Sequence, residues 1–257
     1  MLLVVAALVV ISLWRLQDAG AGVIVTPQQI DDAPAAIFKP ASGARGPVVV
    51  IAHGFAGSQQ LMQSFAYALA RNGYTSVTFD FPGHGRNREP MRGSITEESG
   101  ATRNLVAATA RIADYARTLG DGRLALLGHS MASDIVIRYA QETPAVGATI
   151  AVSMFSPVVT GSSPRNLLVI VGEWEGMLTR EALRVTSLAI APQQAEPETT
   201  YGDFGLGTAR RTAVSPHVEH ASVLFSEKSL REAVQWVDQS FGQVRTQTLF
   251  VPTRGPW

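Results

Sequence analysis

Residues 124–140 read LALLGHSMASDIVIRYA, and their pattern changes at Ser130 from a continuous apolar run to the spacing of a helix. A serine at a strand-to-helix turn, between the small residues Gly128 and Ala132, is typical of a nucleophile elbow. Small neighbours are needed because the turn is sharp, and Ala132 stands where a second glycine is usual. A simpler interpretation is that Ser130 only caps the following helix, and the pattern alone leaves both open.

Outward from this stretch, short β-branched runs alternate with longer helical patterns. Such alternation predicts an α/β fold with a mostly parallel central sheet flanked by helices. Strands are expected over residues 47–52, 74–79, 123–127, 148–154, 167–171 and 210–214. Helices are expected over residues 61–71, 101–119, 132–141, 179–189 and 227–241, with an irregular stretch over 193–207. We expect residues 22–257 to form one domain without a large cap.

Composition narrows the class of protein. The 257 residues carry 21 Lys plus Arg against 21 Asp plus Glu, and only 16% are charged. This balance argues against a nucleic-acid partner, which requires a basic surface. The absence of cysteine excludes disulfides, thiol nucleophiles and iron–sulfur clusters, but it fits oxidising and reducing compartments alike.

The amino terminus is a short apolar segment. Residues 2–13 contain one polar residue, Ser12, and the first charge is Arg15 after Trp14. The run is short for a spanning helix, which needs about 20 residues. A small-residue sequence over 19–21 resembles a cleavage site, although no basic residue precedes the run. We expect residues 1–21 to be a signal peptide or signal anchor, with membrane association through residues 2–14 and a location in the cell envelope or outside the cell. A buried helix is the alternative.

Two further motifs accompany the elbow. His53-Gly54-Phe55-Ala56-Gly57 follows the first predicted strand, and Asp80-Phe81-Pro82-Gly83-His84-Gly85-Arg86 follows the second. With Ser130, these motifs resemble those of the α/β-hydrolase superfamily in type and order, over residues 47–241. The resemblance implies a serine hydrolase with backbone amides at Phe55 and Met131 forming an oxyanion hole.

The resemblance also implies a catalytic histidine and an acid after Ser130 in the chain. Of the two histidines after the last predicted strand, His220 fits the position of the base better than His217. The acid is expected after the strand over 167–171, where Gly172-Glu173-Trp174-Glu175 is similar to a G-x-x-D motif and selects Glu175. Glu173 and Asp203 are the competing carboxylates.

These features predict cleavage of a small-molecule or lipid-like carboxylic ester through an acyl-enzyme, with a Ser130–His220–Glu175 triad. No metal or organic cofactor is implied, since the residues around His217 and His220 match no ligand spacing. Lipases, thioesterases, acyltransferases, perhydrolases and peptidases share such a triad, and an inactive membrane-tethered binding module is the rival class. Oligomeric state stays open. Because only residues 155–166 separate two strands that often flank a lid, we expect an open cleft.

Overall fold

The computed structural model describes residues 2–43, 45–94, 98–245 and 247–251. Its centre is a nine-stranded sheet in the order β1-β2-β4-β3-β5-β6-β7-β9-β8. The five pairs from β4 to β9 are parallel, and the pairs β1·β2, β2·β4 and β8·β9 are antiparallel. The strands are β1 Val23–Ile30, β2 Ala33–Pro40, β3 Val48–Ala52, β4 Thr75–Phe79, β5 Leu124–His129, β6 Val146–Val152, β7 Leu167–Gly172, β8 Thr200–Tyr201 and β9 Arg210–Ser215.

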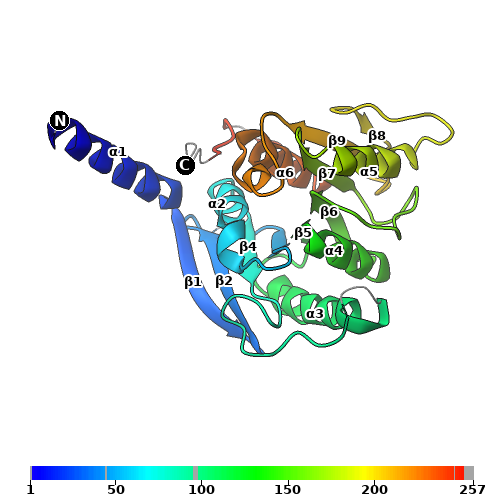
Figure 1. Ribbon diagram of the computed structural model, residues 1–257, viewed down its shortest axis with the longest axis horizontal. Helices are drawn as coiled ribbons and strands as arrows, with labels where there is room; N and C mark the ends of the chain where they lie inside the picture. The colour runs from blue at the N-terminus through cyan, green and yellow to red at the C-terminus, as the bar shows by residue number, and fades with distance from the viewer. Residues whose placement is uncertain (1, 44, 95–97, 246, 252–257) are drawn as a thin grey trace.

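Helices cover both faces of this sheet (Figure 1). Residues of α2 and α6 pack on one face, and residues of α3, α4 and α5 pack on the other. The helices are α1 Leu2–Gly20, α2 Gln63–Arg71, α3 Arg103–Arg117, α4 Met131–Glu142, α5 Gly176–Ser187 and α6 Glu227–Ser240. Shorter helical segments are η1 Gln59–Met62, η2 Glu98–Thr102 and η3 Ser222–Phe225.

Burial on both faces explains why the central strands are apolar without interruption. In β3, Val49 and Ile51 face the layer of α2 and α6, whereas Val48, Val50 and Ala52 face α3 and α4. Successive side chains of a strand point to opposite faces, so a strand covered on both sides needs apolar residues at every position. The α/β fold expected from these runs is confirmed, and residues 155–166 contain no helix and no large cap.

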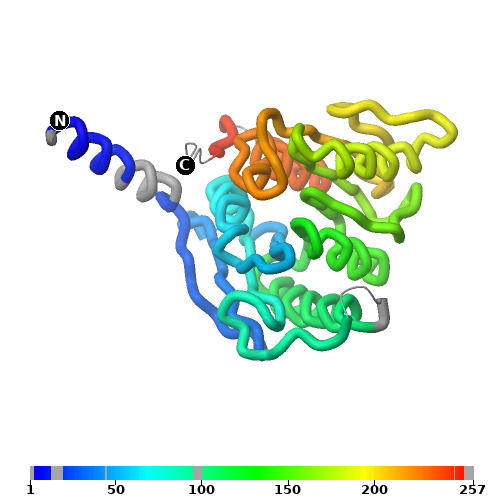
Figure 2. The backbone as a smooth tube through the Cα atoms, viewed as in Figure 1, coloured from blue at the N-terminus to red at the C-terminus, as the bar shows by residue number. Residues whose placement is uncertain are grey.

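The hairpin of β1 and β2 was not predicted. Pro27, Pro34 and Pro40 made this region look like an irregular approach, because proline cannot donate to a ladder. Pro27 lies on the edge strand β1, and the other two lie near the ends of β2. The turn between the strands is Asp31-Asp32, with Asp31 at φ 47°, a conformation that aspartate tolerates better than most residues. Figure 2 shows this hairpin in blue, on the opposite side of the body from the yellow segment that contains β8.

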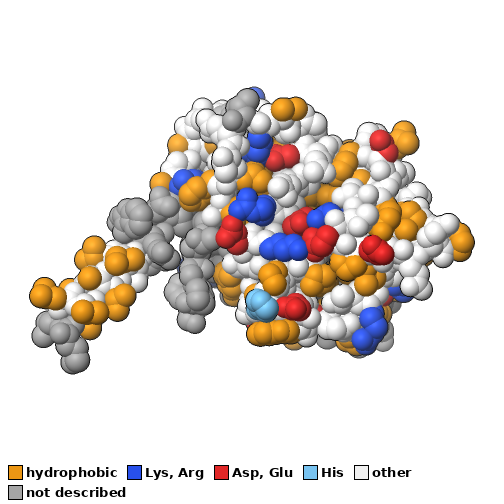
Figure 3. Space-filling view, turned by 90° about the horizontal axis from the view of Figure 1, so that it is seen from above, with side chains coloured by type: hydrophobic (Ala, Val, Ile, Leu, Met, Phe, Trp, Pro, Cys, Tyr) orange, Lys and Arg blue, Asp and Glu red, His pale blue; other side chains and the backbone are white. Residues whose placement is uncertain are grey.

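The apolar amino terminus forms α1, which projects from the body (Figure 3). Residues 3–12 are exposed, so the buried-helix alternative is wrong for this part of the segment. None of the helices in the described part of the chain has the length and apolarity needed to cross a membrane. The junction that follows α1 is held by Arg71 at the end of α2, which donates to the carbonyl oxygen of Ala21.

Candidate active site

Ser130 lies in a strained turn between β5 and α4. Its φ of 52° and ψ of −121° lie outside the regions that a serine normally occupies. The turn depends on Gly128, since a Cβ atom at that position would lie 2.4 Å from the carbonyl oxygen of Ala132. Ala132 itself is fully buried, so its methyl group fits where a glycine was expected. The turn therefore presents the Ser130 hydroxyl at the carboxyl edge of the parallel sheet.

Three side chains from different loops at this edge form a hydrogen-bonded chain. His220, beyond β9, has its Nε2 atom 2.9 Å from Ser130 Oγ. The Nδ1 atom of the same ring lies 2.6 Å from Oε1 of Glu175, which follows β7. With Nδ1 protonated and donating to the carboxylate, Nε2 is free to accept the serine proton. The structure thus brings together Ser130, His220 and Glu175 in a geometry suited to activating a hydroxyl group.

The Glu175 carboxylate is buried, yet it is held in its charged form. Burial alone would raise its pKa, but hydrogen bonds from His220, Ser153 and the Gly172 amide outweigh burial and lower the pKa below its ordinary value. The oxygen that does not face His220, Oε2, accepts from Ser153 Oγ at 2.7 Å and from the Gly172 N–H at 2.7 Å. Ser153 is not among the residues expected from the sequence, because a serine after an apolar strand carries no signal of such a contact.

The Glu175 carboxylate shifts the pKa of the His220 ring. The hydrogen bond that His220 donates to Glu175 raises the pKa of His220 above 6.5, against the lowering effect of burial, and the charges of Glu175 and Glu219 raise it further. Its side chain is 47% exposed, so protons and solvent reach the ring. The imidazolium form is therefore favoured next to Glu175 once a proton has been taken up.

The loop after β3 approaches the serine closely at Gly54. A Cβ atom there would lie 3.0 Å from Ser130 Cβ, so only glycine lets the loop come this near. Phe55 comes next, with its side chain 56% exposed and its ring edge-to-face with His84. Met131 begins α4 directly after Ser130. The loop therefore places the backbone around Phe55 beside the serine, although a role of the Phe55 and Met131 amides as oxyanion donors stays a prediction.

The competing residues lie outside the hydrogen-bonded chain. His217 is paired with Glu173 on the surface, where the Glu173 carboxylate accepts from the His217 backbone amide at 2.7 Å and lies 3.2 Å from its ring. Asp203 accepts from the Leu206 amide within a turn beside β8. Neither carboxylate contacts His220.

Two other histidines of the motifs are buried around the site. The His129 ring lies 4.8 Å from that of His220 and its Nε2–H donates to the His220 carbonyl oxygen at 2.9 Å. Burial, and next the charge of His220, lower the pKa of His129 to about 4. His53 Nε2 accepts from the Phe81 amide, and its Nδ1–H donates to the Gly54 carbonyl oxygen. Burial lowers the pKa of His53 as well. Both rings are thus neutral supports for the surrounding loops.

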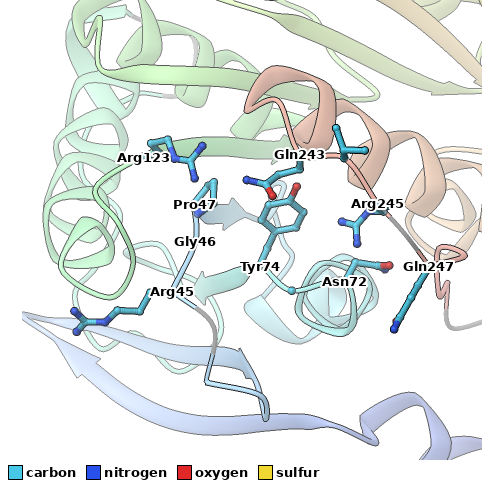
Figure 4. A pocket seen from close by; sticks show the side chains of 11 residues that line it. Arg45, Gly46, Pro47, Asn72, Tyr74, Arg123, Gln243, Arg245 and Gln247 are labelled. Carbon is cyan, nitrogen blue, oxygen red and sulfur yellow. The ribbon is translucent and has the colours of Figure 1, made fainter.

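Elsewhere in the described residues a metal site is absent, and a separate pocket is present. Across the described ranges, no group of three or more His, Asp or Glu side chains could hold a metal ion. A pocket of about 350 Å³ lies at the amino ends of β3, β4 and β5, and its lining includes Tyr74, Arg45, Arg123 and Arg245 (Figure 4). This pocket lies at the opposite edge of the sheet from Ser130.

The fold and the site together define an α/β hydrolase. The family model described as serine aminopeptidase, S33, matches residues 44–251, so the chain belongs to this family of α/β hydrolases. No curated protein sequence matches the chain.

Solved structures share the fold at low sequence identity. TT1662 from Thermus thermophilus is 18% identical with a TM-score of 0.63, covering 87% of this chain and 99% of that one. A CIB-like hydrolase from Thermoplasma acidophilum is 15% identical with a TM-score of 0.59, covering 86% and 99%. A bacterial membrane phospholipase A is 14% identical with a TM-score of 0.54, covering 92% and 96%. At these identities the likeness shows the fold.

Proposed function

We propose that this protein is a serine hydrolase of carboxylic esters, with Ser130 as nucleophile, His220 as general base and Glu175 as the acid that orients it. The observation that carries the proposal is the hydrogen-bonded chain from Ser130 Oγ through the His220 ring to Glu175 Oε1. The substrate class is a small-molecule or lipid-like ester, and no organic cofactor or metal takes part in the proposed reaction.

The reaction proceeds through an acyl-enzyme. Ser130 Oγ attacks the ester carbonyl carbon while His220 Nε2 takes the hydroxyl proton, and the carbonyl electron pair moves to oxygen. The bond to the leaving alkoxide then breaks, and the imidazolium returns its proton to that oxygen to release the alcohol. Water repeats the two steps and frees the carboxylic acid. Glu175 stabilises the imidazolium formed in each half.

The Phe55 and Met131 amides are the proposed donors to the oxyanion. Met131 lies at the amino terminus of α4, where the helix dipole also favours negative charge. Gly54 supports the assignment to Phe55, because its close approach to Ser130 brings the following amide beside the reacting carbon.

Ser130→Ala tests the proposal directly. We expect hydrolysis of p-nitrophenyl esters to fall by several orders of magnitude, since binding and the oxyanion hole alone retain only ~10³ to 10⁴ over water. His220→Ala should lower the rate of hydrolysis as much as Ser130→Ala does. His217→Ala, the control on the surface, should change the rate only slightly. A fluorophosphonate probe should label Ser130 of the parent. Folded protein that is not labelled there would instead support the inactive binding module.

An amide substrate is the second candidate, because the family is described as serine aminopeptidases. The same triad attacks amides, so the two functions differ in the pocket rather than in the chemistry. Comparing kcat/KM for p-nitrophenyl acyl esters with that for aminoacyl p-nitroanilides separates them. We expect the esters to be preferred, and faster cleavage of the anilides would replace the proposal with an aminopeptidase.

The openness of the site supports short to medium acyl chains or bulky esters. The link over residues 155–166 holds no helix, and His220 is nearly half exposed, so within the described residues no lid covers the triad. Hydrolysis of a short-chain ester should therefore rise smoothly across its solubility limit. A sharp increase in rate when droplets form would indicate a moving lid and contradict this part of the proposal.

For the amino terminus, we propose an export or anchor role and a location in the cell envelope or outside the cell. The exposed apolar residues 3–11 support it, since such a surface is unusual on a free helix. Deleting residues 1–21 should leave esterase activity intact, because every proposed site residue follows Pro47. Fractionation of cells expressing the full chain and the deletion should differ, and identical distributions would contradict the anchor.

A further inference from the structure

The end of β6 connects the two loops that carry the serine and the acid. In the sheet, β6 lies between β5, which leads to Ser130, and β7, which leads to Glu175. The Val152 carbonyl accepts from the Ser130 amide at 2.9 Å. The next residue, Ser153, donates its amide to the Ile170 carbonyl of β7 at 2.7 Å. The last residue of β6 and the residue after it therefore bind to both flanking segments at the site.

The Ser153 side chain continues this connection to the acid itself. Its hydroxyl donates to Glu175 Oε2 at 2.7 Å, and the residue is only 2% exposed. Its φ of 51° is a left-handed conformation, which strains the backbone of a serine unless its surroundings compensate. Glycine would adopt this backbone more readily, so the backbone conformation gives no reason for a serine here. The hydrogen bond from the Ser153 hydroxyl to Glu175 gives one.

A glutamate needs more restraint than an aspartate at this position. It has one more rotatable bond between the backbone and the carboxylate, so more conformations compete with the one that faces His220. Ser153 Oγ and the Gly172 amide both hold Oε2, which leaves Oε1 directed at His220 Nδ1. Neither the hydroxyl nor the amide contacts the reacting atoms.

We propose that Ser153 is a positioning residue, whose hydroxyl fixes the Glu175 carboxylate so that a glutamate can orient His220. The inference rests on the proposed function, because it takes Glu175 as the acid of the triad. It extends that function by adding Ser153, a buried residue directly after β6, to the three hydrogen-bonded side chains Ser130, His220 and Glu175.

Ser153→Gly is the main test, since it removes the hydroxyl while the left-handed backbone suits glycine. We expect kcat to fall on the order of 10- to 100-fold with KM nearly unchanged, which is the loss expected for a buried hydrogen bond to a charged group. The acid limb of the kcat/KM profile should move to lower pH, because a less firmly held carboxylate stabilises the His220 imidazolium less. Ser153→Ala should give the same kinetic changes.

Ser156→Ala is the matched control. Ser156 is also buried in the loop after β6, and its hydroxyl donates at 2.6 Å to a carboxylate outside the triad, that of Asp134. It should lower the thermal midpoint without moving the pH limb. A purely structural role for Ser153 would give the same result in Ser153→Gly.

A second experiment uses the coupling between the two side chains. In a Glu175→Asp background, the shorter carboxylate no longer reaches Ser153 as before, so Ser153→Gly should cost much less there than in the parent. Equal costs in both backgrounds would overturn the proposal. Failure of the proposed function looks different: Ser130→Ala would then keep its activity. An inactive Ser130→Ala together with a fully active Ser153→Gly would overturn only the role of Ser153.

Discussion

The turns at the amino ends of the parallel strands, the amino edge, differ from the turns at their carboxyl ends, the carboxyl edge. At the amino edge, tight turns before the strands use glycines with positive φ, such as Gly73 before β4 and Gly122 before β5. At the carboxyl edge, Gly83 and Gly85 have positive φ, but so do the non-glycine residues Ala56, Ser130, Ser153 and His217, whereas Asn166 before β7 is the non-glycine example at the amino edge. Non-glycine residues bear a steric cost in this region that glycine does not.

The pocket in Figure 4 and the hydrogen-bonded side chains around Ser130 lie at opposite edges of the sheet. The amino edge holds the pocket of about 350 Å³ in Figure 4, and its Arg123 and Arg245 are paired with Asp121 and Asp238. The carboxyl edge holds Ser130 in a strained turn and His220 between two hydrogen-bond partners. Strain and linked hydrogen bonds therefore indicate the candidate active site better than cavity size does.

Glu175→Gln should give the largest effect among tests of this comparison. It keeps the shape of the side chain but removes the charge that stabilises the imidazolium, so kcat should fall by about 10³ to 10⁴-fold with a small change in thermal midpoint. Glu173→Gln, two residues earlier on the surface, is the matched control and should stay within a few-fold of the parent. The opposite result would move the acid to Glu173.

The pH profile of the parent should reflect the raised pKa of His220. As the base must be neutral to accept a proton, kcat/KM should increase with pH through a midpoint above 6.5 and fall about tenfold per pH unit well below it. In Glu175→Gln the midpoint should move down towards 6.5. A midpoint below 6.5 in the parent would show that the interaction with Glu175 does not dominate the pKa of His220.

His129→Phe tests the buried histidine at the same edge. Unfolded chain takes up a proton on His129 near pH 6.5, whereas the folded protein resists it down to about 4, so the parent loses stability as pH falls through this window. Two and a half pKa units correspond to about 3 kcal/mol at most. The stability of His129→Phe, measured by urea unfolding at pH 7 and pH 4.5, should depend less on pH. An equal dependence in both proteins would show that His129 is protonated in the fold.

Arg45→Ala at the amino edge should give the smallest effect. The side chain is exposed and lines the pocket, far from Ser130. We expect ester kcat/KM to stay within about twofold of the parent, as surface substitutions usually change stability by no more than about 0.5 kcal/mol. A tenfold change in kcat/KM would show that this pocket affects the hydrolysis of esters, and the two edges would then not differ in function.

Local patterns predicted the central strands and the elbow, because each strand buried on both faces must be apolar and a sharp turn needs small neighbours. The resemblance then placed His220 and Glu175, which the structure brings into contact with Ser130 and each other. Two features carry no local signal. The β1–β2 hairpin turns on Asp31-Asp32 rather than on a glycine, and its prolines lie on an edge or near strand ends. Ser153 meets Glu175 only through tertiary structure, across 22 residues.

The point at which α1 joins the body fixes which way the site faces. Val23 pairs with Pro40 beyond the start of β4, and Arg71 at the end of α2 holds Ala21, so α1 leaves from the amino edge. Ser130 opens at the other edge of the same sheet. Whatever contacts the exposed face of α1 would therefore lie on the side of the sheet away from Ser130, and the approach to the Ser130 hydroxyl would stay open to solvent.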